Sequence, residues 1–168
     1  MLLKNTIVNK YFEKRAASYA RNSNRGFWHF IRARESRALF NHLGNISGHN
    51  ILELGCGAGY YTTRLLEHNP KNIVAVDSSQ AMVATLSSRN IKAVVADAQS
   101  LNLGQSFDLI VCAGLLEFVE KPVSVLKRAR EHAHSGSNLI ILVPQRNLWG
   151  LTYRVFHSSH GISIKLFD

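Results

Sequence analysis

Three glycines at alternate positions, Gly55, Gly57 and Gly59, directly follow a short apolar run that ends at Leu54. A helix-like segment begins at once, at Tyr60. Glycine allows the backbone to turn with positive φ, and it lets a ligand approach closer than a Cβ would permit. The start of a helix also presents free N–H groups to a bound polar group. The spacing fits a ligand-binding loop, and it fits an ordinary strand-to-helix turn equally well.

A carboxylate further along the chain favours the ligand-binding interpretation. Asp77 closes the apolar run 72–76. It lies roughly 20 residues beyond the glycines, where nucleotide-binding α/β proteins place a carboxylate on ribose hydroxyls. An ionised carboxylate can accept from both hydroxyls because it offers several lone pairs and no donor. Helix capping is the competing role, but Ser78 or Ser79 can cap the helix instead.

The segment 53–59, Glu-Leu-Gly-Cys-Gly-Ala-Gly, resembles the first motif of class I S-adenosylmethionine-dependent methyltransferases. The resemblance continues through Val-Asp-Ser-Ser at 76–79, Ala-Asp-Ala-Gln at 96–99 and Phe-Asp-Leu-Ile-Val-Cys-Ala-Gly-Leu-Leu-Glu at 107–117. A dinucleotide-binding domain is the competing assignment, with the fingerprint G-x-G-x-x-G. Tyr60 stands where that spacing needs its third glycine, and it is too large for the close helix-to-strand packing. We therefore favour the methyltransferase.

The alternation of apolar runs and helical stretches predicts an α/β fold with a doubly wound, mostly parallel sheet, Rossmann-like and of the class I methyltransferase type. We expect strands near 50–54, 72–76, 91–96, 107–112 and 138–143. We expect helices at 60–68, 79–88 and 122–133, the last ended by Gly136, and two N-terminal helices, the second over 27–42. Residues 1–44 are interpreted as a basic helical lid segment and 45–168 as the S-adenosylmethionine-binding domain, together forming one compact unit.

The end of the chain departs from the family pattern. Related methyltransferases normally add two strands after the fifth, whereas only 25 residues follow Val143 here. A helix near 145–157 uses about half of them, and the tail 162–166 fits either one alternating strand or the start of another helix. We expect the sheet to lack the last two strands, in a naturally short or a truncated chain. The strand 138–143 then becomes an edge that can pair with a second molecule.

The resemblance implies a cofactor site beyond the carboxyl ends of the strands. Asp97 would accept from the adenine amino group while the Ala98 backbone reads the ring edge, although a turn-forming role also fits Asp97. Glu53 would receive the methionine ammonium, because a charge inside an apolar strand otherwise has no explanation. Met82 fits packing on the adenine or in the core. The predicted cofactor-binding residues are Glu53, Gly55, Cys56, Gly57, Gly59, Tyr60, Asp77, Ser78, Met82, Asp97, Ala98, Gln99, Ala113, Arg15 and Tyr19.

Arg15 belongs to this set because of its position on the first helix. It falls within an apolar stripe that recurs at helical spacing, formed by Val8, Tyr11, Phe12, Ala16 and Tyr19. An unpaired charge is costly in such a stripe. Arg15 either extends its guanidinium to solvent or faces the pocket and pairs with the methionine carboxylate.

The chemistry follows from the implied cofactor. S-Adenosyl-L-methionine carries an electrophilic methyl group, and S-adenosyl-L-homocysteine is its product, so the protein mainly holds a nucleophile in line. No residue is identified as a general base, and catalytic residues stay unassigned. The segment 116–122 resembles the Leu-Glu-His-Val-x-x-Pro of small-molecule methyltransferases, with Phe118 replacing the histidine.

This pattern predicts methyl transfer to a small-molecule or lipid-like acceptor. Cys112-Ala-Gly-Leu stands where methylases of nucleic-acid bases carry Asn/Asp-Pro-Pro-Tyr/Phe, which disfavours a nucleic-acid substrate. The alternative function is a non-catalytic module that binds S-adenosylmethionine, S-adenosylhomocysteine or a partner protein. The short C-terminus and the missing base support that alternative, whereas the complete first motif supports the enzyme.

Charge is concentrated at the N-terminus. The formal net charge is +9, and residues 1–37 contain nine basic and two acidic residues interleaved with aromatic ones. Such a segment fits an anionic membrane surface, nucleic acid or an acidic substrate. Two solvated amphipathic helices are the simpler explanation. No apolar run has the length of a membrane span and no secretory signal is recognisable, so we expect a cytoplasmic protein.

Cysteines and histidines do not predict a metal site. Cys56 and Cys112 cannot form a disulfide framework or a CxxC site, and we interpret both as small buried thiols. His132 and His134 lack a carboxylate at metal-ligand spacing. A solvated helix terminus explains these two histidines better than zinc does.

Overall fold

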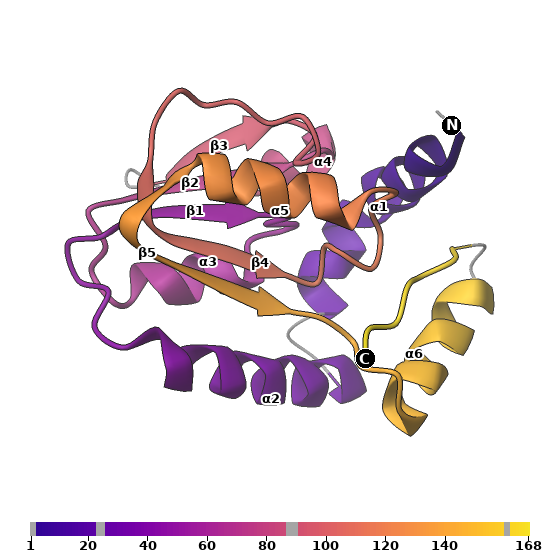
Figure 1. The fold of residues 1–168 in the computed structure, drawn as a ribbon. Helices are drawn as coiled ribbons and strands as arrows, with labels where there is room; N and C mark the ends of the chain where they lie inside the picture. Colours follow the sequence, from indigo (N-terminus) through magenta and orange to yellow (C-terminus); the bar gives the residue numbers. More distant parts are fainter. Residues whose placement is uncertain (1–2, 23–25, 87–90, 160–161) are drawn as a thin grey trace.

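Five parallel strands form the centre of the protein in a computed structural model, which is described for residues 3–22, 26–86, 91–159 and 162–168. Their order in the sheet is β3-β2-β1-β4-β5 (Figure 1). Every neighbouring pair is parallel. The predicted doubly wound α/β fold is therefore confirmed. The strands are β1 (Asn50–Leu54), β2 (Asn72–Asp77), β3 (Ile91–Val95), β4 (Phe107–Ala113) and β5 (Ala133–Leu142).

Helices cover both faces of this sheet (Figure 1). Two long helices, α1 (Leu3–Asn22) and α2 (Gly26–Leu43), precede the first strand. The crossovers between strands contain α3 (Tyr60–Leu66), α4 (Gln80–Val83) and α5 (Pro122–Glu131). The last helix, α6 (Leu148–Ser159), lies at the periphery of the molecule beside the C-terminal tail (Figure 1). No helix in the described part of the chain has the length and apolar character to cross a membrane.

Side chains alternate between two hydrophobic clusters because successive residues of a strand point to opposite faces. Leu52 and Leu54 of β1 pack with α5, whose Val125 is fully buried. Ile51, on the opposite face, packs in the cluster to which α2 and α3 contribute Leu39 and Leu65. Glu53 shares the face of Ile51 by this alternation. Its carboxyl therefore enters the core on the side covered by α2 and α3.

Two predicted helix boundaries were wrong. The helix expected over 79–88 is limited to α4, which ends at Val83, and residues 87–88 of that expectation lie outside the described part. Ser79 caps α4, since its Oγ accepts from the Met82 nitrogen at 3.1 Å. The helix expected over 122–133 ends at Glu131. There the backbone nitrogen of Phe107 donates to the carbonyl of His132 at 2.9 Å, and β4 draws the following residues into β5.

The C-terminal tail is neither the helix nor the strand that was considered. Residues 162–166 have no regular structure, and an isolated bridge joins Phe167 to Gln145. Ile162 and Ile164 are buried in a third cluster that contains Val8 of α1 and Phe118. The tail thus packs against both the N-terminal helix and the loop after β4.

Candidate cofactor site

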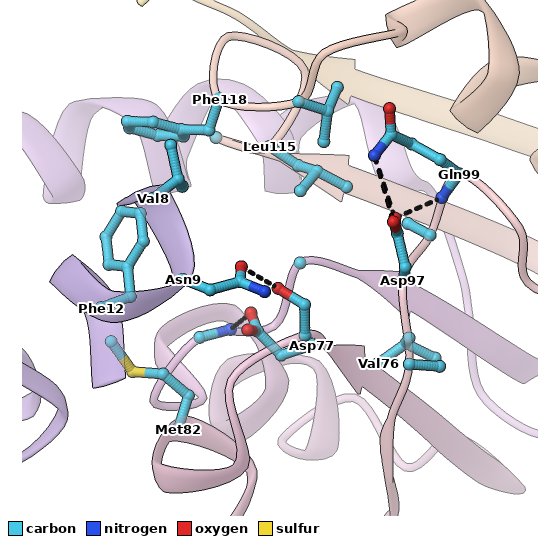
Figure 2. A pocket seen from close by; sticks show the side chains of 17 residues that line it. Val8, Asn9, Phe12, Val76, Asp77, Met82, Asp97, Gln99, Leu115 and Phe118 are labelled. Atoms are coloured by element: carbon cyan, nitrogen blue, oxygen red, sulfur yellow. Dashed lines mark hydrogen bonds between the residues drawn. The ribbon is translucent and has the colours of Figure 1, made fainter. Parts of the chain in front are cut away.

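A pocket lies at the carboxyl ends of the strands, where α1 crosses them (Figure 2). The loops after β1, β2, β3 and β4 all contribute to its walls, as expected for ligand binding in a doubly wound sheet. One turn of α1 faces these loops across the pocket (Figure 2). The lining residues are Val8, Asn9, Phe12, Gly55, Gly57, Val76, Asp77, Ser78, Met82, Ala96, Asp97, Ala98, Gln99, Gly114, Leu115, Phe118 and Val119.

The glycine loop is fixed to the neighbouring strand. The backbone nitrogens of Gly55 and Cys56 both donate to the carbonyl of Val76, at 2.8 and 3.0 Å. Gly55 has a φ of 74°, and a Cβ placed there would lie 2.9 Å from the Cβ of Leu115. Glycine is therefore required at this position both by the backbone conformation and by the space available. Gly59, with a φ of 83°, precedes α3 as its N-cap.

Asp77 is held between two loops. Its Oδ2 accepts from the Gly57 nitrogen and its Oδ1 from the Ser79 nitrogen, both at 2.9 Å. Loss of hydration raises the pKa of Asp77, while the backbone N–H groups of Ser79 and Gly57 oppose this rise. The carboxyl group reaches the pocket (Figure 2). A carboxylate keeps lone pairs for two further hydroxyl donors after accepting these bonds.

Asp97 lines the pocket at the end of β3 and also forms a turn. Its Oδ1 accepts from the Gln99 backbone nitrogen at 2.8 Å and from the Gln99 side-chain amide at 3.2 Å (Figure 2). Gln99 in turn accepts from the Lys121 nitrogen at 2.9 Å. Both roles considered for Asp97 are therefore compatible with its position. Ala98 and Met82 line the pocket while being largely buried in the protein.

Glu53 does not line the pocket but is buried behind the glycine loop, with 1% of its surface exposed. Loss of hydration raises the pKa of its carboxyl group to about 8, with the Thr62 hydroxyl opposing the rise and Asp77 adding to it. Within the described residues, its Oε2 has no hydrogen-bond partner. A buried carboxylate oxygen of this kind is costly unless a donor or cation reaches it.

The remaining predicted residues of the glycine loop and β4 surround the pocket without lining it. Cys56 and Ala113 are buried, and burial raises the pKa of the Cys56 thiol. Cys112 is buried as well, so the interpretation of both cysteines as buried thiols is confirmed. The Tyr60 ring is covered by the Arg64 guanidinium, 3.6 Å from its centroid.

Arg15 does not line the pocket. Its Nη1 donates to the Tyr11 hydroxyl at 2.9 Å, and its guanidinium carbon lies 4.4 Å from the centroid of the Tyr11 ring. The Tyr19 side chain lies outside the described residues. The assignment of Arg15 and Tyr19 to the cofactor therefore stays a prediction.

Nine lining residues were not among the predicted ones, namely Val8, Asn9, Phe12, Val76, Ala96, Gly114, Leu115, Phe118 and Val119. Asn9 and Phe12 come from α1, and Phe118 comes from the loop after β4. Phe118 packs edge-to-face on Phe12, with ring centroids 5.2 Å apart, and at the same separation on His157 of α6. The apolar stripe of the first helix identified Phe12 as buried. Its partner across the pocket depends on tertiary structure and left no signal in the sequence.

The two histidines after α5 differ from expectation. His132 is buried rather than solvated, because its Nε2 accepts from the Leu103 nitrogen at 2.9 Å. The Nε2 of His134 lies 3.0 Å from Oδ1 of Asp108, so a carboxylate far away in sequence is its partner. Among the described residues, no three His, Cys, Asp or Glu side chains are grouped closely enough to hold a metal ion.

Comparison with known proteins identifies the family. Residues 51–136 match the family model described as a methyltransferase domain. A malonyl-[acyl-carrier protein] O-methyltransferase of Bacillus cereus is 30% identical over 140 residues, covering 78% of this chain and 50% of that protein. A tRNA U34 carboxymethyltransferase of Campylobacter fetus is 31% identical over 104 residues, covering 58% of this chain and 37% of that protein. The chain thus spans half the length, or less, of these curated relatives.

A solved structure shows the same fold. The magnesium protoporphyrin IX methyltransferase of Synechocystis, crystallised with S-adenosylhomocysteine, superposes with a TM-score of 0.75 at 19% identity, covering 98% of this chain and 83% of that chain. The family match extends over half of the sequence and includes the glycine loop, Asp77 and Asp97. The chain belongs to the methyltransferase-domain family, the class I methyltransferases whose cofactor is S-adenosyl-L-methionine.

Proposed function

We propose that the protein transfers a methyl group from S-adenosyl-L-methionine to a small-molecule or lipid-like acceptor. The main support is the position of Asp77, which is held between Gly57 and Ser79 and reaches the same pocket as Asp97. When bound, the cofactor supplies an electrophilic methyl group, and the protein contributes binding, orientation and the exclusion of water.

The residues of the pocket fit the parts of this cofactor. Asp77 would accept from the ribose hydroxyls, with Ser78 beside it, and Gly55 and Gly57 leave room for close backbone approach. Asp97, Ala98 and Gln99 would hold the adenine, with Met82 packing on it. The unpartnered Oε2 of Glu53 fits the methionine ammonium, reached directly or through water. Cys56, Gly59, Tyr60 and Ala113 would shape the loop around it, and Arg15 and Tyr19 would receive the methionine carboxylate.

The nature of the acceptor is suggested by the walls of the pocket. Val8, Phe12, Leu115 and Phe118 give it an apolar side, which suits an acyl or lipid-like group. The titratable side chains among the described lining residues are Asp77 and Asp97, both assigned to the cofactor. An acceptor such as a carboxylate, which is ionised before attack, needs no general base. A carboxylate on an acyl chain is therefore the first acceptor to test.

Other partners are proposed from the basic N-terminal segment, from the name of a relative and from the edge of the sheet. The basic N-terminal segment 1–44 would act as the lid and would also suit an anionic membrane surface. The sequence disfavours nucleic acid, but a curated relative is named for tRNA, so tRNA belongs among the acceptors tested. The edge strand β5 would allow self-association, and we propose a cytoplasmic location.

Release of S-adenosylhomocysteine in the presence of candidate acceptors tests the function. The panel contains a malonyl thioester, a fatty acid, a phenol, an amine and unmodified tRNA, and the control omits the acceptor. We expect release with the carboxylate acceptors. If the protein binds S-adenosylhomocysteine but forms none from S-adenosylmethionine with any acceptor, the non-catalytic module is supported instead.

A further inference from the structure

Helix α1 is fastened to the turn after β2 at two points. Oδ1 of Asn9 accepts from the Ser78 hydroxyl at 2.8 Å (Figure 2). One turn further along the helix, the Glu13 carboxylate accepts from the Ala81 nitrogen at 2.9 Å and from the Ser79 hydroxyl. Between these two residues in the sequence, Phe12 enters the pocket opposite the strand ends (Figure 2).

The turn that receives Glu13 is the turn that carries Asp77. The Ser79 backbone nitrogen donates to Asp77, whose other oxygen accepts from Gly57. The Ser79 hydroxyl donates to Glu13. A continuous series of hydrogen bonds therefore runs from the glycine loop through Asp77 and Ser79 to α1. The position of α1 is coupled to the group proposed to hold the ribose.

Glu13 is well suited to this contact. It accepts from the Ala81 N–H, which belongs to the first turn of the short helix α4 and has no acceptor within that helix. The Ser79 hydroxyl and the Ala81 N–H hold the pKa of Glu13 below its usual value, so it is ionised at neutral pH. Hydrogen bonds to a charged group contribute more than neutral ones. Ser79 also caps α4 itself through the Met82 nitrogen, so α4 does not depend on Glu13 alone.

We propose that Glu13 is a positioning residue that fastens α1 over the bound cofactor and thereby sets how long S-adenosylmethionine or S-adenosylhomocysteine stays bound. This inference rests on the proposed cofactor site. It assigns the contact that holds α1 over that site to the Glu13 side chain. Val8 and Phe12 supply apolar cover, and Glu13, the charged one of the two fastening residues, holds that cover in place.

The dissociation rate of S-adenosylhomocysteine tests this role. It is measured by rapid mixing of the preformed complex with excess unlabelled ligand, for the unsubstituted protein, Glu13→Ala and Glu13→Gln. The control is Lys14→Ala, which removes an exposed charge from the next position of the same helix. We expect Glu13→Ala to raise the dissociation rate about tenfold, the effect of losing a hydrogen bond to a charged group, with a smaller change in association rate. Glu13→Gln keeps an acceptor oxygen and should be intermediate.

A second readout separates fastening of the helix from general stability. Hydrogen exchange of the α1 amides is compared with and without S-adenosylhomocysteine. We expect the ligand to protect α1 in the unsubstituted protein and in Lys14→Ala, to protect it much less in Glu13→Ala, and to give intermediate protection in Glu13→Gln. Unchanged release and unchanged protection would overturn the proposal while leaving the cofactor site intact. Failure of the unsubstituted protein to bind S-adenosylhomocysteine would contradict the proposed function itself. If Glu13→Ala does not fold, Glu13→Gln decides the matter.

Discussion

The Asp77 carboxylate accepts a hydrogen bond from the Gly57 backbone nitrogen over 2.9 Å and so joins the turn after β2 to the glycine loop after β1. The two loops are adjacent because β1 and β2 pair in parallel, with Leu54 opposite Val76. The other oxygen of Asp77 is fixed by the Ser79 nitrogen. The carboxylate is therefore oriented before any ligand arrives, which lowers the entropic cost of binding.

Replacing Gly55 should damage both the fold and the pocket. Gly55→Ala combines a positive φ of 74° with a Cβ that would lie 2.9 Å from Leu115 Cβ. Gly48→Ala is the matched control, because Gly48 has a φ of 77° and no atom within 4 Å of the added carbon. We expect Gly48→Ala to cost about 1 kcal/mol for the left-handed backbone. Gly55→Ala should cost roughly 1–3 kcal/mol more from overpacking.

Denaturant unfolding of the two variants measures this difference, and titration with S-adenosylhomocysteine shows its effect on the pocket. Only Gly55→Ala should lose affinity for the ligand. Equal losses of stability in the two variants would mean that Leu115 can move away without cost.

Affinity for S-adenosylhomocysteine should rise with pH because of Glu53. Burial raises the pKa of this carboxyl to about 8, so the free protein holds it protonated at neutral pH. A ligand ammonium favours the ionised form, and binding then releases a proton. Below pH 8 the affinity should increase by up to about tenfold per pH unit and then level off. Calorimetry in buffers of different ionisation enthalpy measures the released proton, and Glu53→Gln should abolish both effects. A flat profile would remove Glu53 from the site.

The raised pKa of Glu53 should make the free protein less stable as the pH rises, whereas it should make the binding of S-adenosylhomocysteine tighter. A carboxyl whose pKa rises from 4.5 in the unfolded chain to about 8 in the folded one contributes most below pH 4.5. Its contribution declines as the pH rises through 8. Glu117 adds to this decline, because burial raises its pKa to about 7. The thermal midpoint of the free protein should therefore fall between pH 5 and pH 8, and Glu53→Gln should flatten that fall.

The edge strand β5 should promote self-association of this 168-residue chain. It pairs only with β4 in the described sheet, and its Leu139 and Ile141 are 43% and 38% exposed. Lysine on an edge strand opposes pairing with another chain. Leu139→Lys should therefore lower the mass measured by light scattering, whereas Val123→Lys, on an exposed site of α5, should not. A strictly monomeric unsubstituted protein would contradict this expectation.

Local sequence predicted the strands and the loops that carry the pocket. The apolar runs at 50–54 and 72–76 are followed directly by Gly55 and Asp77, and the run at 107–112 is followed by Ala113 and Gly114. Each of the three became a buried strand that leads into the pocket. These features depend on residues close together in the chain, where side-chain pattern and backbone conformation determine each other.

Contacts between distant residues could not be predicted in the same way. In the sequence, Glu13 is an acidic residue in a basic helix with no visible partner. The fold places it against Ser79, which lies 66 residues further along the chain. His132 was expected at a solvated helix end, but the Leu103 nitrogen and the start of β4 bury it. Arg15 had two interpretations, solvent or the pocket, and helical spacing alone did not show that its guanidinium would instead contact Tyr11, four residues earlier on the same helix.

Titration calorimetry with S-adenosylhomocysteine, with NADH as the competing ligand, tests the central claim most directly. The unsubstituted protein should bind one equivalent of S-adenosylhomocysteine and no NADH. Asp77→Ala should weaken that binding by about 1.5–3 kcal/mol, the range for hydrogen bonds to a charged group. Glu131→Ala, which removes an exposed carboxylate from the end of α5, should bind normally. Binding of NADH in place of S-adenosylhomocysteine, or unchanged affinity in Asp77→Ala, would contradict the assignment of this pocket.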